Sequence, residues 1–138
     1  MCITNLAKHA ANEIQGEPPM TTNESAENYL ETILILSHKR PVVRSVDIAN
    51  ELGFKKSSVS VAMKNLREKN HISVTPEGFI YLTDAGKEIA EMIYERHRLL
   101  TAWLIRLGVD EQIAAEDACR MEHVISKESF EAIKNHIK

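Results

Sequence analysis

The hydrophobic residues between Ser25 and His38 recur at steps of three and four, which is the spacing of one face of an α-helix. The apolar positions of this stretch are Ala26, Tyr29, Leu30, Ile33 and Leu36. Because proline disfavours helical backbone at the residue before it, we expect the helix to end just ahead of Pro41. No such period is sustained over residues 1–22, so we predict a flexible or loosely docked tail there.

Residues 45–70 predict two short helices joined by a tight turn. Ser45 is the expected N-cap of the first helix, and Gly53 is its expected left-handed stop. The second helix is expected to begin near Lys56 or Ser57, with an inner face made of Val59, Ala62, Met63 and Leu66. A helix, a short glycine-containing turn and a second helix form the helix-turn-helix pattern.

Residues 72–82 contain two β-rich runs on either side of Thr75-Pro76-Glu77-Gly78. Proline in second place and glycine in fourth place are typical of a type I turn, so we predict a β-hairpin. A hairpin that directly follows a helix-turn-helix makes a winged helix. This order of elements favours a DNA-binding function.

The pattern after the hairpin is helical to the end of the chain. Thr83 is the expected cap of a long helix that ends near Gly108, with an apolar stripe made of Ile89, Ile93, Leu100, Trp103, Leu104 and Leu107. Asp110 and Ser126 are the expected caps of two further helices. We interpret this part as the dimerisation and sensing region, because it has more apolar surface than a tail would need.

The charge is distributed unevenly along the chain. The net charge is −3, yet residues 39–69 carry eight Lys or Arg residues against three acids, a net charge of +5, which leaves −8 for the rest. A compact basic segment on an acidic body indicates a local anionic partner. Exposed charges are also common on helices without any ligand, so the basic segment favours DNA only together with the winged-helix order.

The outer face of the second helix is small, rich in hydroxyl groups and basic, which suits a major groove. We expect Ser57, Ser58, Ser60 and Lys64 to reach the DNA. We expect Arg44, Lys55 and Lys56 to contact mostly phosphates.

Composition narrows the cellular setting. No run approaches the roughly 20 apolar residues of a membrane span, and residues 1–20 lack the apolar core of a secretory signal. Two cysteines, one of them at position 2, do not make a disulfide framework. We therefore expect a cytoplasmic protein with no membrane partner.

Cys119, Glu122 and His123 stand at i, i+3 and i+4, so a helix places them on one face. A thiolate, a carboxylate and an imidazole form a ligand set for a divalent transition metal of intermediate softness. The same spacing also fits a buried cysteine, a solvated glutamate and a histidine near the negative end of the helix dipole. A catalytic pair of Cys119 with His123 is possible, but no Gly-rich loop or oxyanion donor accompanies it, so we do not expect an enzyme.

Several segments together resemble a known family. Residues 116–126 resemble the metal-site helix of the diphtheria toxin repressor family. Members of this family are iron- and manganese-responsive bacterial transcription regulators. Residues 26–33, 46–52, 57–60 and 95–100 agree with that family in order and spacing, so that the resemblance covers roughly residues 22–137. The chain length resembles the two-domain manganese transport regulators rather than the iron-type members that carry a third domain.

The resemblance implies a fold and a ligand set. The fold is mostly α, with a winged helix-turn-helix DNA-binding domain over residues 23–83 and an all-helical metal-binding and dimerisation domain over residues 84–138. The family's metal-binding positions fall on Asn28, Glu31, His97, Cys119, Glu122 and His123. Cys119 resembles the iron type and Glu31 the manganese type, whereas Asn28 departs from both. The iron type's ancillary site is incomplete, because Thr101 and Ala115 occupy two of its ligand positions, although His97 and Arg98 remain.

The implied function is a homodimeric repressor of metal-ion uptake genes that binds an inverted-repeat operator in double-stranded DNA. Its effector would be Fe²⁺ or Mn²⁺, with Co²⁺, Ni²⁺ or Zn²⁺ able to substitute in vitro. The residues leave one alternative open, a winged-helix regulator that senses oxidation at Cys119 or a small organic ligand. DNA binding measured with a chelator and with added metal, in reductant, separates the two.

Overall fold

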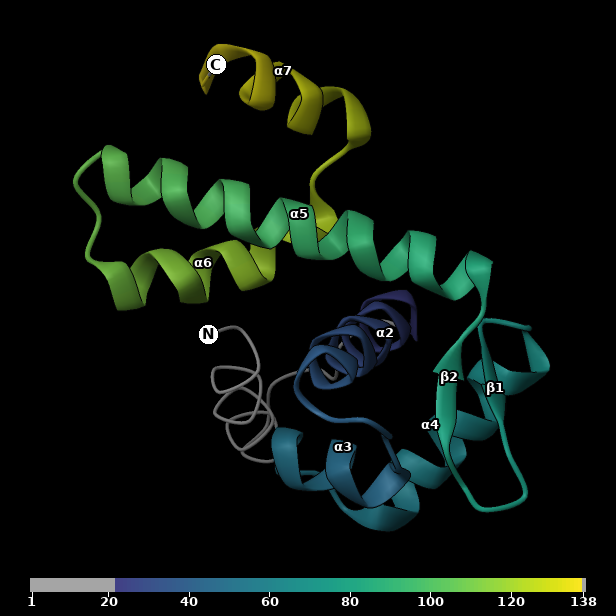
Figure 1. The fold of residues 1–138 in the computed structure, drawn as a ribbon. Helices are drawn as coiled ribbons and strands as arrows, with labels where there is room; N and C mark the ends of the chain where they lie inside the picture. Colours follow the sequence, from purple (N-terminus) through teal and green to yellow (C-terminus); the bar gives the residue numbers. More distant parts are fainter. Residues whose placement is uncertain (1–21, 138) are drawn as a thin grey trace.

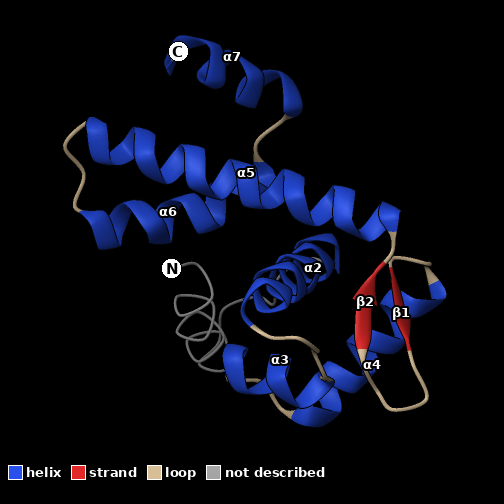
Figure 2. Cartoon of the chain, viewed as in Figure 1, coloured by secondary structure: helices blue, strands red, loops and turns tan. Residues whose placement is uncertain are grey.

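The computed structural model describes residues 22–137, in which a first helix is followed by a helix-turn-helix, a hairpin and three further helices (Figures 1 and 2). The predicted tail lies outside the described residues except for Thr22. The elements in chain order are α2 (Thr22–Lys39), α3 (Ser45–Leu52), α4 (Lys56–Glu68), β1 (Ile72–Val74), β2 (Ile80–Leu82), α5 (Asp84–Arg106), α6 (Glu111–Val124) and α7 (Lys127–Ile137). The predicted fold class, mostly helical with a winged helix, is confirmed.

Helix α2 connects the two halves of the molecule. Its apolar face is buried in the core of the winged helix, together with Ile48 and Leu52 of α3 and Val59 and Met63 of α4. The same helix also packs against α5, which pairs with α6 in an antiparallel hairpin (Figure 1). Helix α2 therefore packs both in the core of the winged helix and against α5.

The turn between α3 and α4 forms as predicted, but the start of α3 does not. Gly53 adopts a left-handed conformation with φ of 70°, which glycine tolerates without steric cost. The prediction that Ser45 is the N-cap is wrong: Ser45 is the first helical residue and Arg44 is the cap. The Asp47 carboxylate accepts a hydrogen bond of 2.9 Å from the Arg44 backbone N–H, so the acid in the first turn of the helix satisfies the N–H of the cap, as the N3 acid of a capping box does.

The hairpin lies where the sequence predicts it. Its strands pair antiparallel, with Ser73 opposite Tyr81 at the centre, and the Gly78 N–H donates a hydrogen bond of 2.9 Å to the Thr75 carbonyl across the turn. The Ile80 N–H of β2 donates to the Val43 carbonyl at 2.8 Å. This last bond ties the wing to the segment that precedes α3.

Helix α5 begins tightly against the wing. Thr83 caps it, since its side chain accepts a hydrogen bond of 3.1 Å from the Gly86 N–H. A Cβ at position 86 would lie 1.9 Å from the His71 carbonyl oxygen, so only glycine allows this approach. Leu107 is not part of the buried stripe: it follows the last helical residue and its side chain is 64% exposed. Helix α7 packs on α5 through a second core made of Leu100, Ala118 and Phe130.

Candidate metal centre and DNA-binding face

Helix α6 carries the predicted Cys/Glu/His triplet. Asp110 caps this helix, as predicted, by accepting hydrogen bonds from the backbone N–H groups at its start. Cys119 and Glu122 are buried, and only 4% of the His123 side chain is exposed. One face of α6 therefore brings a sulfur, a carboxylate and an imidazole into the protein interior.

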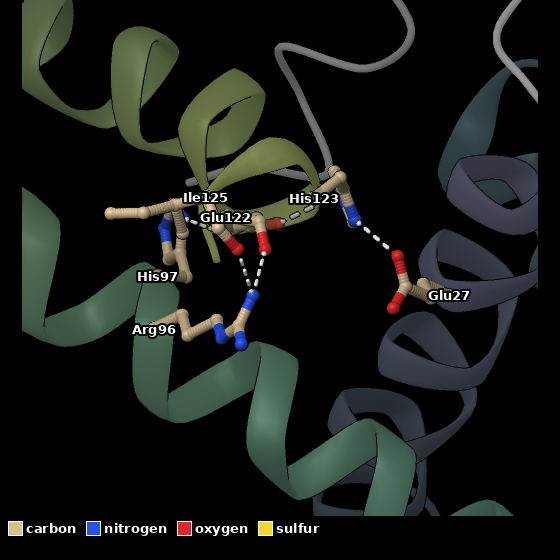
Figure 3. Close-up of polar contacts among 6 residues, drawn as sticks. All are labelled: Glu27, Arg96, His97, Glu122, His123 and Ile125. Carbon is tan, nitrogen blue, oxygen red and sulfur yellow. Dashed lines mark hydrogen bonds and ion pairs between the residues drawn. The ribbon is translucent and has the colours of Figure 1, made fainter. Parts of the chain in front are cut away.

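Glu122 lies at the centre of the cluster, between two imidazoles (Figure 3). His97 of α5 places its Nδ1 3.0 Å from Glu122 Oε2. His123 places its Nε2 3.2 Å from Glu122 Oε1, without the geometry of a hydrogen bond. The ligand atoms of His97, Cys119 and Glu122 all lie within 4.8 Å of one another. The structure therefore brings together His97 and the α6 triplet, from two helices.

Glu31 of α2 extends the cluster to a third helix. Glu31 is 1% exposed, and neither of its carboxylate oxygens receives a hydrogen bond from the described residues. Burial raises the pKa of Glu31 to about 8, and the negative charge of Glu122 adds to this rise while His123 opposes it. Asn28 is also buried, one turn before Glu31, and its place in the ligand set stays a prediction.

His123 contacts a carboxylate that the sequence did not suggest. Its Nδ1 lies 3.2 Å from Glu27 Oε1 on α2 (Figure 3). Burial lowers the pKa of His123, but its contacts with Glu122 and Glu27 and the negative charges of both outweigh burial and raise the pKa to about 9. In the absence of a metal ion, a proton on this imidazole therefore offsets part of the negative charge of the cluster.

Arg96 fixes the end of α6. Its Nη1 donates hydrogen bonds to the carbonyl oxygens of Glu122, at 3.1 Å, and Ile125, at 3.0 Å. Its guanidinium also lies over the Phe130 ring of α7, 5.4 Å from the ring centre. Arg96 thus holds the backbone beside the cluster and connects α5, α6 and α7.

Cys119 is engaged in a disulfide bond. The chain's other cysteine, Cys2, lies outside the described residues. The nucleophilic and metal-binding form of cysteine is the thiolate. Cys119 can therefore serve as a metal ligand only when this bond is reduced.

The donor set fits a divalent cation. Glu31 and Glu122 are two buried carboxylates, and the negative charge of Glu122 makes Glu31 harder to ionise. In the part of the chain that the structure describes, the oxygens of Glu31 have no donor, although buried polar groups are normally satisfied. Oxygen, imidazole and sulfur ligands from three helices are the mixture that Fe²⁺ and related ions accept, and a set richer in oxygen favours Mn²⁺.

The basic outer face of α4 is open to solvent. All seven residues predicted to reach DNA are exposed: Arg44, Lys55, Lys56, Ser57, Ser58, Ser60 and Lys64. Arg44 lies over the Phe79 ring of the wing at 4.8 Å, so one side chain joins the cap of α3 to the hairpin. Roles of these residues in DNA binding stay predictions.

Comparison with known families then decides the identity of the fold. Residues 21–78 match the model for the iron dependent repressor N-terminal DNA binding domain. Residues 83–138 match the model for the iron dependent repressor metal binding and dimerisation domain. The chain belongs to the iron-dependent repressor family. The resemblance to the diphtheria toxin repressor family is thereby confirmed.

Individual relatives are regulators of transcription by name. The chain is 35% identical over 115 residues to an uncharacterised HTH-type transcriptional regulator of Methanocaldococcus jannaschii, covering 81% of this chain and 91% of that one. It is 33% identical to the transcriptional regulator MntR of Escherichia coli O6:H1, covering 80% of this chain and 72% of that one. The structure of the manganese regulator SloR matches with a TM-score of 0.73 and 26% identity, over 86% of this chain and 54% of that one. The chain thus spans about half the length of that solved relative.

Three residues near the candidate metal centre or the α4 face were not expected from the sequence. Glu27 and Arg96 look like ordinary surface charges in the sequence, and only the packing of α2 and α5 on α6 brings them to the cluster. Val61 is 61% exposed on α4, four residues after Ser57 and three before Lys64. The sequence offered an indication of Val61, because an apolar residue among polar ones on a helix face expected to meet DNA can contact a thymine methyl group.

Proposed function

We propose that this chain is a metal-dependent DNA-binding repressor, with Fe²⁺ or Mn²⁺ as effector, that controls genes for metal-ion uptake. One observation carries the proposal. Buried carboxylates and imidazoles from α2, α5 and α6 converge, and no donor within residues 22–137 reaches the oxygens of Glu31. The converging helices include the one that forms the core of the winged helix.

Residues of two parts of the fold would hold the ion. Glu31 belongs to α2, whereas His97, Cys119, Glu122 and His123 belong to α5 and α6. An ion held by these residues would supply positive charge that offsets the negative charge of the carboxylates. A ligand that prefers one arrangement of these helices shifts the population towards it, and such couplings are typically about 1–3 kcal/mol. The favoured arrangement in this proposal is the one that presents α4 to DNA.

The DNA contacts in this proposal come from α4 and its flanks. Helix α4 enters the major groove with Ser57, Ser58, Ser60 and Lys64, while Arg44, Lys55 and Lys56 contact mostly phosphates. The protein binds as a dimer through residues 84–138, near the α5–α6 turn, where Ile105, Leu107 and Ile113 are 40%, 64% and 51% exposed. A two-fold dimer implies an inverted repeat with half-sites about a helical turn or more apart.

The remaining parts of the proposal concern the setting. Within residues 22–137, no helix is long and apolar enough to cross a bilayer. We propose a cytoplasmic regulator that catalyses no reaction. Residues 23–83 form its DNA-binding domain and residues 84–138 its metal-binding and dimerisation domain.

The test is an anaerobic titration of DNA binding with metal, in reductant. Fluorescence anisotropy follows a labelled duplex selected from a random library with the Mn²⁺-loaded protein. The proposal expects Fe²⁺ or Mn²⁺ to tighten binding by about 5–150-fold over chelator-treated protein, which is the range of typical couplings. The His123→Ala variant should keep its fold by circular dichroism and lose this response. Equal binding with metal and with chelator rejects the proposal.

One observation favours a second candidate, a regulator that responds to oxidation. Cys119 is in a disulfide bond and lies within the same cluster. Under this candidate, DNA binding in the presence of chelator would change on addition of reductant, and Cys119→Ser would abolish that change. A response to metal but not to reductant excludes it.

A further inference from the structure

The contact between Glu27 and His123 joins residues that are 96 positions apart. Glu27 lies near the start of α2, and His123 lies at the end of α6. The carboxylate is 23% exposed on its side chain, so it lies at the rim of the cluster, whereas the imidazole is 4% exposed. The two side chains form a polar bridge between the first described helix and the helix that carries the triplet (Figure 3).

The His123 ring lies between two carboxylates, one on each nitrogen. Nδ1 is 3.2 Å from Glu27 Oε1, and Nε2 is 3.2 Å from Glu122 Oε1. The two nitrogens of an imidazole point in different directions in the plane of the ring, so a group bound to Nδ1 and a group bound to Nε2 lie apart. The Nε2 side faces the cluster, and the Nδ1 side faces Glu27.

We infer that Glu27 is a positioning residue for the metal centre: it accepts the Nδ1 proton of His123 and so directs Nε2 towards the ion. The inference rests on the proposed function. A metal-binding histidine commonly donates its other N–H to a carboxylate, which fixes the tautomer and the ring orientation. Here that carboxylate comes from a different helix, so the orientation of the ligand depends on the position of α2.

The same helix therefore acts on the centre in two ways. Glu31, four residues after Glu27 and hence on the same face of α2, brings its own oxygens to the cluster. Glu27 brings none to the Nε2 side and acts through His123. A displacement of α2 would remove one ligand and release the orientation of another, which couples metal binding to the element that forms the core of the winged helix.

The test compares Mn²⁺ affinities under anaerobic, reducing conditions, with free Mn²⁺ measured by electron paramagnetic resonance. Loss of an outer-sphere carboxylate typically weakens metal binding by about 10–100-fold, and Glu27→Ala should fall in that range. Glu27→Gln, which keeps an acceptor but no charge, should lose less. Glu91→Ala is the control, because it also deletes a carboxylate from an ion pair, the exposed pair that Glu91 forms with Lys87 of α5, and it should bind Mn²⁺ as the wild type does.

A double-mutant cycle separates positioning from direct ligation. If Glu27 acts through His123, then Glu27→Ala should cause less than about a twofold further loss in a His123→Ala background. A full loss in that background would overturn the inference, because Glu27 would then bind the ion itself. Wild-type affinity in Glu27→Ala would overturn it as well.

A second measurement needs no variant that alters folding. Long-range ¹⁵N–¹H spectra of the wild-type protein loaded with Zn²⁺, which is diamagnetic, report which nitrogen of His123 carries the proton. The inference expects a proton on Nδ1 and the metal on Nε2; the opposite assignment overturns it. If the wild-type protein binds neither Mn²⁺ nor Zn²⁺, the proposed function itself fails. If the wild type binds metal and the Glu27 variant binds it equally well, only the inference about Glu27 fails.

Discussion

Replacing Arg96 by methionine should destabilise the fold by removing a cation that three helices share. Arg96 is 8% exposed, and its guanidinium donates to the Glu122 and Ile125 carbonyls and lies over the Phe130 ring. Methionine is of similar length, so it preserves much of the packing while deleting both donors. The two carbonyl oxygens would lose a charged partner at the end of α6.

The magnitude follows from these three contacts. A hydrogen bond to a charged group contributes about 1.5–3 kcal/mol, and a partly desolvated cation–π contact about 0.5–2 kcal/mol. Two such bonds and one such contact exceed about 3.5 kcal/mol, and the methionine side chain recovers part of this through apolar burial. We expect a loss of about 3 kcal/mol in the free energy of unfolding, a large part of the roughly 5–15 kcal/mol available to a domain.

The assay is urea unfolding of reduced, metal-free protein, followed by circular dichroism at one protein concentration because dimerisation adds to stability. Arg96→Lys should recover part of the loss, since an ammonium can still donate to a carbonyl. Arg98→Met is the matched control: Arg98 is an exposed arginine two residues later on α5, and we expect a change within about 0.5 kcal/mol. A change below about 1 kcal/mol in Arg96→Met would refute the reasoning.

Three shorter predictions concern pH, DNA and the wing. The pKa values of Glu31 and His123, about 8 and about 9, exceed their ordinary values of 4.5 and 6.5. The folded metal-free protein therefore binds more protons than the unfolded chain over this range. Its free energy of unfolding should fall as the pH rises from about 5 to 9. Urea titrations across that range check the sign, and Mn²⁺ affinity should rise over the same window, because ligands release protons on binding. Lys64→Ala should weaken DNA binding, whereas Lys127→Ala on α7 should not. If Lys64 contacts phosphate, the loss should be a similar factor for all duplexes and the salt slope should fall by about 1; unchanged affinity at physiological salt in the anisotropy assay would remove Lys64 from the interface. Gly86→Ala should cost about 1–3 kcal/mol or more in urea unfolding, because its Cβ would lie 1.9 Å from a backbone oxygen; wild-type stability would show that this approach is not required.

Local patterns in the sequence predict most of the fold. The three- and four-residue spacing locates α2, and Gly53, Thr83 and Asp110 mark helix ends that the structure confirms. The Thr75–Gly78 turn places the hairpin because its chemistry is also local. The two errors arise where a position depends on context: α3 begins one residue earlier than expected, where Asp47 accepts from the Arg44 N–H, and Leu107 lies beyond the end of the helix whose stripe it was expected to join.

The candidate metal centre is predictable only in part. Cys119, Glu122 and His123 share a helix face by spacing alone, and the structure brings His97 to them. Glu27 and Arg96 lie on helices that are distant in sequence from α6, and no local pattern indicates that they meet it. Their contacts depend on how α2 and α5 pack, which one sequence without its fold does not specify.

The central claim is that metal binding and DNA binding are coupled, and thermodynamic reciprocity tests it most directly. The dissociation constant of Mn²⁺ is measured by electron paramagnetic resonance, in reductant, with and without a saturating selected duplex. The account predicts that DNA tightens Mn²⁺ binding by the same factor by which Mn²⁺ tightens DNA binding, once both are expressed per site. Equal Mn²⁺ affinities with and without DNA would contradict the account, even if the protein binds both.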